Sequence, residues 1–519
     1  MKKRWKELIF AVWLISSMVA MGYIFLKNGY NLVNSDDSAE LILARLLSEG
    51  NGILSRGWMY STELRVVNTQ LIRALLFRIT DNWMSVRIVS SLVLDLWLLI
   101  SYGFFVIQLT GKRKWFWYTA PFLLVPFSGE TFYVYGAMAY YIPHLALSFQ
   151  ILGLCIGLWK DNRSKLLKYL LLAAVSLLAA LGGIRQLFIT TVPLMLALFF
   201  LVLRHSELLE KKKEFRTPCL AIGWSAIWSF TGYLVNAKLL TKIYHFKAYN
   251  ELHLIQPTME RLQVILRGIL NVFGYTEGDV PDTLLMSEKG ILLVLSLGFL
   301  VWMGLLLLLI WKNRNSLSLV SEFVYWFSIW GFLLCFLLFL FTDVEVTARY
   351  YLLHIMMFVP LLAVFYRETG LSTEVKRLLY GMAVIAVVIL SFGVYRNELR
   401  KTANEERAIL KEYLVEHGYT YGYATFWNAD VMTELSGGRI EMAALEEHDG
   451  NCSLFPWLVS LDTLFPREPK KDVFLILHGN ERNKFSSLIE NREATFETES
   501  LYLYTYESSA EFTALLTQE

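Results

Sequence analysis

The stretch Gly290–Trp311, GILLVLSLGFLVWMGLLLLLIW, decides the class of this protein. An uncharged apolar run of about 18 or more residues is a transmembrane candidate, because ~20 helical residues at ~1.5 Å each cross a ~30 Å hydrocarbon core. Similar runs recur along the 519 residues, of which 55% are hydrophobic and only 18% are charged. Soluble domains carry about 25% charged residues. The sequence therefore predicts an all-α polytopic membrane bundle.

About eleven transmembrane helices are expected. Their approximate limits are 8–26, 86–109, 115–127, 141–159, 167–181, 187–203, 217–237, 290–311, 318–341, 350–366 and 377–395. The first run follows a basic start and could pass for a signal peptide. It continues past the small-residue site at Ala20–Gly22, so we interpret it as an uncleaved helix.

The distribution of Lys and Arg orients these helices. Alternate connections carry basic residues, as in Lys112–Lys114 and Lys312–Arg314, whereas the opposite short connections are nearly bare. By the positive-inside rule the N-terminus is cytoplasmic. An odd number of spans then places the C-terminus outside, in a multi-pass plasma-membrane protein.

Two domains are predicted. Residues 1–395 form the transmembrane domain, with long outer loops at 27–85 and 238–289, and residues 396–519 form a small extracytoplasmic α/β domain. The tail predicts a helix at 400–416, strands at 421–425, 472–479 and 500–507, and helices at 426–438 and 480–492. Loops longer than about 15 residues tend to be functional, so the function is expected on the outer face.

The first outer loop begins with Tyr30–Leu47, YNLVNSDDSAELILARLL. Asp37 with Glu40 three residues later resembles a capping box, in which Asp37 is the N-cap and Asp36 a solvated neighbour. The alternative is that Asp36 or Asp37 is a general base that takes a proton from an acceptor hydroxyl. A divalent cation is a third alternative, although two acids alone do not specify a metal site.

Further candidates for substrate binding lie in the outer connections. Glu63 and Arg65 precede an expected helix at 63–80, where the structural alternative is a helix-start acid and a surface base. Glu130 is followed by four tyrosines, and an acid among aromatic rings is typical of sugar sites. The alternative there is an interfacial aromatic belt. These tyrosines are Tyr133, Tyr135, Tyr140 and Tyr141.

Basic residues at the outer ends of spans are candidates for phosphate binding. Arg185 and Arg349 can each form a bidentate fork to a phosphate, or extend along apolar surface toward the interface. The second long loop contributes His245 and His253 as weaker candidates. It also contains an amphipathic helix at 257–274, which either lies in the membrane interface or covers the bundle.

The composition supports neither a nucleic-acid-binding protein nor a disulfide-stabilised one. A net charge of +2 does not argue for nucleic-acid binding. The four cysteines contain no CxxC and suggest no disulfide framework.

The pattern resembles the GT-C superfamily of membrane glycosyltransferases, in particular bacterial family-39-type proteins and wall-polymer transferases. The resemblance rests on Asp36–Asp37 after the first span, Glu130 in the second outer loop, and Arg349–Tyr350 at the start of a late span. It implies a polyprenyl-phosphate or polyprenyl-diphosphate sugar as donor, hexosyl or pentosyl transfer, and chemistry on the outer side of the membrane. It implies that Asp36 or Asp37 is the base, Glu130 a second acid, and Arg349 a phosphate contact.

Three functions follow from these observations. The first is transfer of a sugar to an envelope glycopolymer, lipid or protein. The second is transport or flipping of a lipid-linked saccharide, which predicts several polar groups inside the spans and repeated halves. The spans contain Asp95 and few other polar groups of this kind, and no repeat is evident. The third is a non-catalytic assembly protein whose outer domain binds envelope partners.

Overall fold

The computed structural model describes residues 2–50, 52–61, 64–139, 141–161, 163–206, 212–247, 252–275, 286–490 and 492–517. The chain divides into two compact units, each built from segments far apart in the sequence. Unit 1 contains Met1–Tyr23, Ser91–Ala237 and Asn250–Glu398, and unit 2 contains Ile24–Ser90, Lys238–Tyr249 and Leu399–Glu519. Each unit is described separately below.

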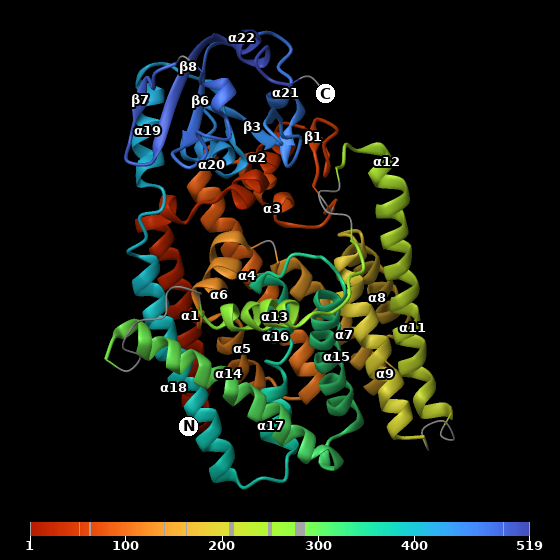
Figure 1. Ribbon diagram of the computed structural model, residues 1–519. Helices are drawn as coiled ribbons and strands as arrows, with labels where there is room; N and C mark the ends of the chain where they lie inside the picture. The colour runs from red at the N-terminus through yellow and green to blue at the C-terminus, as the bar shows by residue number, and fades with distance from the viewer. Residues whose placement is uncertain are drawn as a thin grey trace. The chain divides into compact units, whose positions relative to one another are not determined.

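Unit 1 is helical (Figure 1). Its helices are α1 (Lys2–Asn28), α4 (Trp83–Thr110), α5 (Lys114–Leu124), α6 (Gly129–Phe132), α7 (Ile142–Lys160), α8 (Lys165–Ala180), α9 (Val192–Arg204), α11 (Lys212–Leu234), α13 (Met259–Val272), α14 (Glu288–Lys312), α15 (Leu319–Phe341), α16 (Ala348–Met356), α17 (Leu361–Glu368) and α18 (Thr373–Glu398), of which α1 and α4 continue into unit 2. Short π-helical turns, η2 (Tyr133–Met138), η3 (Leu187–Thr191) and η4 (Val235–Leu240), interrupt the pattern.

In the described part of the chain, nine helical stretches are long and apolar enough to cross a membrane. They correspond to nine of the eleven expected spans. The other two, 115–127 and 167–181, fall on α5 and α8, which have 11 and 16 residues and are shorter than a full crossing. The predicted polytopic membrane bundle is confirmed.

The helix expected at 257–274 is α13, which begins after its N-cap Thr258. It packs closely on the bundle: a Cβ atom at Gly268 would lie 2.6 Å from Val346 Cγ1, just before α16. Arg261 donates to the backbone carbonyls of Phe339 (2.9 Å) and Thr342 (2.8 Å) at the end of α15. Of the two alternatives for this helix, the structure favours a cover over the bundle.

Unit 2 joins the first outer loop to the C-terminal tail. The loop contributes η1 (Gly29–Leu32), α2 (Ser35–Glu49), β1 (Trp58–Met59) and α3 (Thr69–Phe77), and α12 (Thr241–Ile243) comes from the second long loop. The tail contributes α19 (Glu405–Glu416), β2 (Tyr421–Thr425), α20 (Phe426–Leu435), β3 (Glu441–His448), β4 (Asn451–Leu454), β5 (Val459–Ser460), α21 (Leu461–Leu464), β6 (Lys471–His478), β7 (Phe496–Glu497), β8 (Leu501–Ser508) and α22 (Ser509–Thr513). Antiparallel pairing of Trp58 with Ser460 links β1 of the loop to β5 of the tail.

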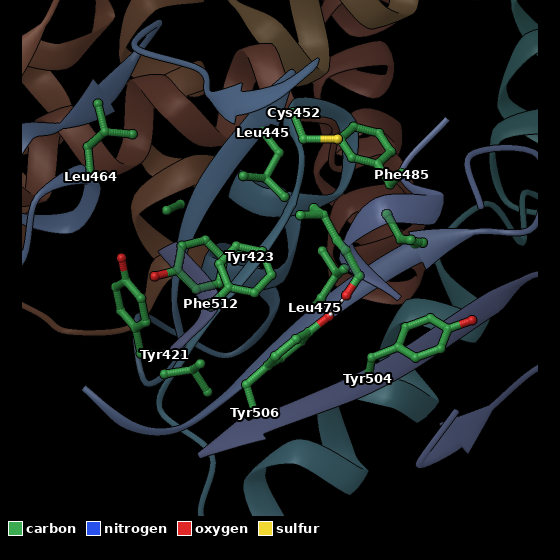
Figure 2. Packing of buried hydrophobic residues seen from close by; sticks show 14 of the residues in the cluster. Tyr421, Tyr423, Leu445, Cys452, Leu464, Leu475, Phe485, Tyr504, Tyr506 and Phe512 are labelled. Atoms are coloured by element: carbon green, nitrogen blue, oxygen red, sulfur yellow. Dashed lines mark hydrogen bonds between the residues drawn. The ribbon is translucent and has the colours of Figure 1, made fainter. Parts of the chain in front are cut away.

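The tail forms a six-stranded mixed sheet in the order β4-β3-β2-β6-β8-β7. Strand β2 runs parallel to β3 and β6, and the other pairs are antiparallel. Figure 2 shows the aromatic core on this sheet, where the rings of Tyr423 and Phe512 stack at 3.9 Å. The predicted small α/β domain is confirmed.

Two local predictions are wrong, and two strands were not predicted. The described residues of the range 480–492, which are 480–490 and 492, form no α-helix and contain only the 3-10 turn η6 (Ser486–Leu488), because Asn and Ser side chains favour turns over helix interiors. The helix expected at 63–80 is limited to α3, Thr69–Phe77. Strands β3 and β4 were not expected, because EMAALEEH has a helical composition that pairing with β2 overrides.

Candidate functional site

The acidic pair lies in the first turn of α2, which begins one residue earlier than Asp36. Asn34 is extended and caps the helix, and its side-chain oxygen accepts from the backbone N–H of Asp37 at 3.2 Å. The predicted capping role of Asp37 is therefore wrong. Asn and Asp are equally good N-caps, and here the earlier one takes the position. Both acids lie at the positive end of the helix dipole.

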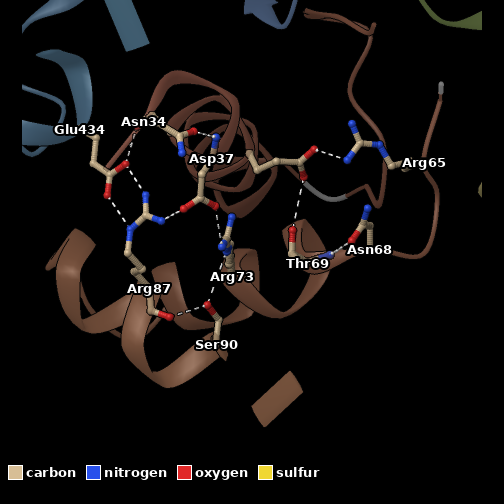
Figure 3. Close-up of polar contacts among 11 residues, drawn as sticks. Asn34, Asp37, Arg65, Asn68, Thr69, Arg73, Arg87, Ser90 and Glu434 are labelled. Atoms are coloured by element: carbon tan, nitrogen blue, oxygen red, sulfur yellow. Dashed lines mark hydrogen bonds and ion pairs between the residues drawn. The ribbon is translucent and has the colours of Figure 1, made fainter. Parts of the chain in front are cut away.

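Asp37 is fully buried between two arginines (Figure 3). Arg73 of α3 donates from Nη2 to Asp37 Oδ1 at 3.0 Å, and Arg87 of α4 forms an ion pair with the other oxygen. Arg87 also holds Glu434 of α20 through two bonds, from Nε at 2.9 Å and from Nη2 at 2.5 Å. The two carboxylates and two guanidiniums alternate, so their formal charges cancel.

Ser38, one turn from the helix start, adds a bond to this network by donating to Glu434 Oε2 at 2.7 Å. We call Asp37, Arg73, Arg87 and Glu434 the buried ion network. Breaking a buried ion pair by removing one partner typically costs about 3–5 kcal/mol. Both oxygens of Asp37 are engaged by arginines, so the acidic pair leaves only Asp36 to receive a proton or a cation.

Asp36 is half-buried on the same turn. It interacts electrostatically with Asp430 of α20, a second acid that the sequence reasoning missed. Burial raises the pKa of Asp430 well above its usual range, and the negative charges of Asp36 and Glu434 raise it further. Asp36 and Asp430 thus lie close enough in unit 2 for their charges to interact, and burial disfavours the charged form of Asp430.

Arg65 is placed beside the same helix. Its Nη1 lies 3.2 Å from Glu40 Oε1, and Thr69 donates to the other Glu40 oxygen at 3.3 Å (Figure 3). Both charged side chains are largely buried, which favours a role in holding α2 against α3. Glu63, predicted with Arg65, lies outside the described residues.

In unit 1 the structure brings three predicted residues together. The Arg185 guanidinium lies 4.7 Å from the ring centroid of Tyr350 and 5.4 Å from that of Tyr141. Its Nη2 donates to the Tyr350 hydroxyl at 3.4 Å. Cations over aromatic faces are stabilised by the ring quadrupole, so the two tyrosines hold Arg185 in place. Tyr140, predicted with them, lies outside the described residues.

Glu130 and Arg349 lie on two elements of unit 1 that are in contact, α6 and α16. Glu130 is half-buried in the first turn of α6, behind a capping box formed by Ser128 and Thr131. Arg349 is half-buried at the start of α16, next to Tyr350. We call Arg185 with Tyr141 and Tyr350 the Arg185 clamp. Both predicted residues thus belong to the same region of unit 1 as this clamp.

The histidines of the second long loop have different surroundings. His253 is exposed, and its ring Nδ1 lies 2.8 Å from Asp343 Oδ2 while its backbone N–H donates to Oδ1 at 2.9 Å. These bonds lower the pKa of Asp343. His253 therefore ties the loop to the segment after α15. His245 is exposed, and its carbonyl accepts from the Tyr60 N–H.

The sequence analysis did not select the arginines and acids that pair with the predicted residues, and only one of them has a recognisable sequence signal. Arg87 stands near the start of an apolar span, and a charge in such a position marks a site by default. Glu40, Arg73, Asp430 and Glu434 carry no such mark. Among the residues that the structure describes, no group of three or more His, Cys, Asp and Glu side chains is placed to hold a metal ion.

Comparison with known proteins identifies the fold. No protein-family model and no curated protein sequence matches the chain. Among solved structures, ArnT from Cupriavidus metallidurans in the apo state matches with a TM-score of 0.54 at 10% identity, covering 100% of each chain. ArnT bound to undecaprenyl phosphate matches with a TM-score of 0.50 at 10% identity, covering 98% of this chain and 99% of that one.

An oligosaccharyltransferase from Archaeoglobus fulgidus in its apo form is a weaker match, with a TM-score of 0.44 at 11% identity over 83% of this chain and 64% of that one. The two ArnT matches extend over nearly the whole chain, so the protein shares the overall fold of ArnT. The resemblance drawn from the sequence is thereby confirmed at the level of the fold.

Proposed function

We propose that this protein transfers a sugar from a polyprenyl-phosphate-linked donor to a cell-envelope acceptor on the outer face of the membrane. The observation that carries the proposal is the whole-length likeness of its fold to ArnT, a protein whose structure is solved with bound undecaprenyl phosphate. A polyprenyl lipid is soluble in the bilayer that surrounds the membrane bundle, so the donor can reach the protein from the membrane. The polar unit 2 supplies acidic groups for an acceptor that arrives from water.

In the proposed reaction, the acceptor hydroxyl oxygen attacks the anomeric carbon of the donor sugar. The bond between that carbon and the phosphate oxygen breaks, and polyprenyl phosphate leaves with the electron pair. The acceptor proton passes to Asp36, the general base. Asp37 does not take this role, because both its oxygens are in ion pairs with buried guanidiniums. It instead fixes the helix turn that carries Asp36.

The donor phosphate is assigned to the basic residues of unit 1. A guanidinium matches a phosphate as a bidentate fork, and Arg185 is already positioned by two tyrosine rings. Arg349 is the second candidate, and Glu130 supplies a further acid in that region. The Lys and Arg distribution supports a cytoplasmic N-terminus and an outer C-terminal domain.

The test is turnover of a radiolabelled polyprenyl-phosphate sugar pool in membranes that contain the protein, against membranes that lack it. We expect release of polyprenyl phosphate together with label in a water-soluble or glycolipid acceptor. Movement of intact labelled donor between leaflets without cleavage would indicate a flippase instead. No change in the pool would indicate a non-catalytic assembly protein.

A further inference from the structure

Unit 2 contains a pocket of about 310 Å³ that the proposed reaction does not use. All its lining residues belong to unit 2, and they come from α2, β1, Asp81 and the start of α4, α20 and the turn after it, β3, β5 and α21. Small-molecule sites begin at about 300 Å³ and combine aromatic walls with a few polar groups. The volume and the mixed lining fit a ligand of the size of one sugar ring.

The base of the pocket is built from buried side chains. Trp58 is fully buried and Trp83 is 8% exposed, and both line the pocket. Gly438, beyond the end of α20, has a φ of +76°, and a Cβ there would lie 3.0 Å from the Trp83 ring. Because Gly438 has no side chain, the space next to the Trp83 indole stays free on this side of the pocket. The apolar faces of pyranoses stack on flat aromatic rings, and of the two indoles Trp83 is the one with exposed surface for this contact.

Two polar groups of this lining have unused hydrogen-bonding capacity. Asp430 is 4% exposed, and its Oδ2 finds no hydrogen-bond partner among the described residues. The same holds for the indole Nε1 of Trp58. Buried polar groups are nearly always paired, so two unpaired groups lining one pocket require an explanation. A sugar hydroxyl can both donate and accept, which is the chemistry for which these two groups have no partner.

The charges at the rim decide which saccharides fit. Among the described residues that line the pocket, Arg45 is the only basic one, and it is bound by Glu49 at 3.0 Å and by Asp81. Glu441 adds a third carboxylate. Acids exceed bases, so an anionic ligand would meet repulsion there.

We propose that the pocket between Trp58, Trp83 and Asp430 binds one pyranose residue of a saccharide that is uncharged or carries an amine, and that it excludes anionic sugars. The further assignment of this saccharide to the acceptor rests on the proposed function. The binding site itself does not, because it is defined by unit 2 alone.

The test is a tryptophan-fluorescence titration of the full-length protein in detergent with N-acetylglucosamine, glucosamine and glucuronic acid. We expect the first two to bind and glucuronic acid to bind at least about tenfold more weakly. Asp430→Leu should weaken binding about tenfold, the equivalent of one lost hydrogen bond. Trp83→Phe should weaken binding and reduce the signal. Matched controls are Asp462→Leu, an exposed acid in α21, and Trp427→Phe, an exposed indole on α20.

The proposal is overturned if none of the three sugars binds the wild type, if glucuronic acid binds most tightly, or if both pocket variants bind like the wild type. If one of the two pocket variants fails to fold, sugar binding by the other variant tests the proposal. The order of affinity of the three sugars for the wild type tests it independently of both variants. The titration contains no donor, so binding without any transfer in membranes would refute the proposed function and leave the site standing. In active membranes, Asp430→Leu should raise the KM for the acceptor more than it lowers kcat.

Discussion

At Asp37 one carboxylate meets two guanidiniums in a position closed to solvent. Asp36 is the adjacent residue in the sequence, but its surroundings are different: it is half-buried, whereas Asp37 is buried and paired with two arginines. The sequence alone left open which of the two acids is the base, because the partners Arg73 and Arg87 lie more than thirty residues away. Only the tertiary fold separates a structural acid from an available one.

Replacement of Asp37 by Asn should therefore reduce stability. It leaves the guanidiniums of Arg73 and Arg87 with less negative charge in a buried site, and we expect a loss of about 3–5 kcal/mol in the free energy of unfolding. Denaturant unfolding in detergent, followed by circular dichroism, measures this loss. Asp36→Asn is the matched control and should remain within about 1 kcal/mol of the wild type. Equal effects of the two substitutions would refute the assignment of different roles.

Asp430 predicts a pH dependence with a definite sign. Its pKa is raised in the folded protein, so between the unfolded and folded pKa values the native state binds more protons than the unfolded one. Its contribution to stability is therefore full below the unfolded value of about 3.9 and decreases as the pH rises. Asp430→Asn should be more stable than the wild type at neutral pH, and the difference should vanish in acid. Thermal unfolding across this pH range gives the difference, and one that is constant with pH would contradict it.

At the scale of elements, periodicity and turn residues predicted most of the structure. The strands β2, β6 and β8 and the helices α13 and α20 lie where their patterns indicate. The failures occur where local preference and tertiary pairing disagree. Strand β3 contains Glu, Met, Ala and Leu in helical proportions, yet it pairs in parallel with β2 and its central residues are buried. No local signal records that pairing.

The bond between α4 and α20 gives a prediction at this scale. Arg87 and Glu434 are 347 positions apart and join the first outer loop region to the sheet domain within unit 2. Arg87→Met and Glu434→Leu should each destabilise strongly, because each leaves a buried charge unbalanced. The double variant should lose less than the sum of the two. A double-mutant cycle on detergent-solubilised protein measures the coupling, and strict additivity would show that the pair is not coupled.

At the scale of the whole molecule, hydropathy predicted the membrane class directly, and the fold likeness to ArnT extends over the entire chain. The sequence did not predict which of the candidate residues lie together in space. Arg185, Tyr141 and Tyr350 were each chosen separately, and the structure gathers them into one clamp. Their separation of up to 209 positions in the numbering explains why spacing could not reveal this cluster.

The proposed orientation is testable on the same scale. Alkaline phosphatase, which folds only outside the cytoplasm, should be active when fused after Ser508 and inactive when fused within the basic link Lys312–Arg314. The positive-inside rule predicts this pattern, because Lys and Arg in short links remain cytoplasmic. Phosphatase activity per amount of fusion protein is the readout. The opposite pattern would reverse the orientation and place the acidic pair on the cytoplasmic side.

The measurement that tests the central claim most directly is transfer from the radiolabelled polyprenyl-phosphate sugar pool by Asp36→Asn, compared with the wild type at equal amounts of folded protein. Removal of a general base typically lowers the rate by about 10²–10⁴-fold. We predict a loss of this size with unchanged unfolding, and near wild-type transfer for Asp462→Asn in the tail. Wild-type transfer by Asp36→Asn would contradict the account, since the remaining first-turn acid, Asp37, is bound on both oxygens by arginines.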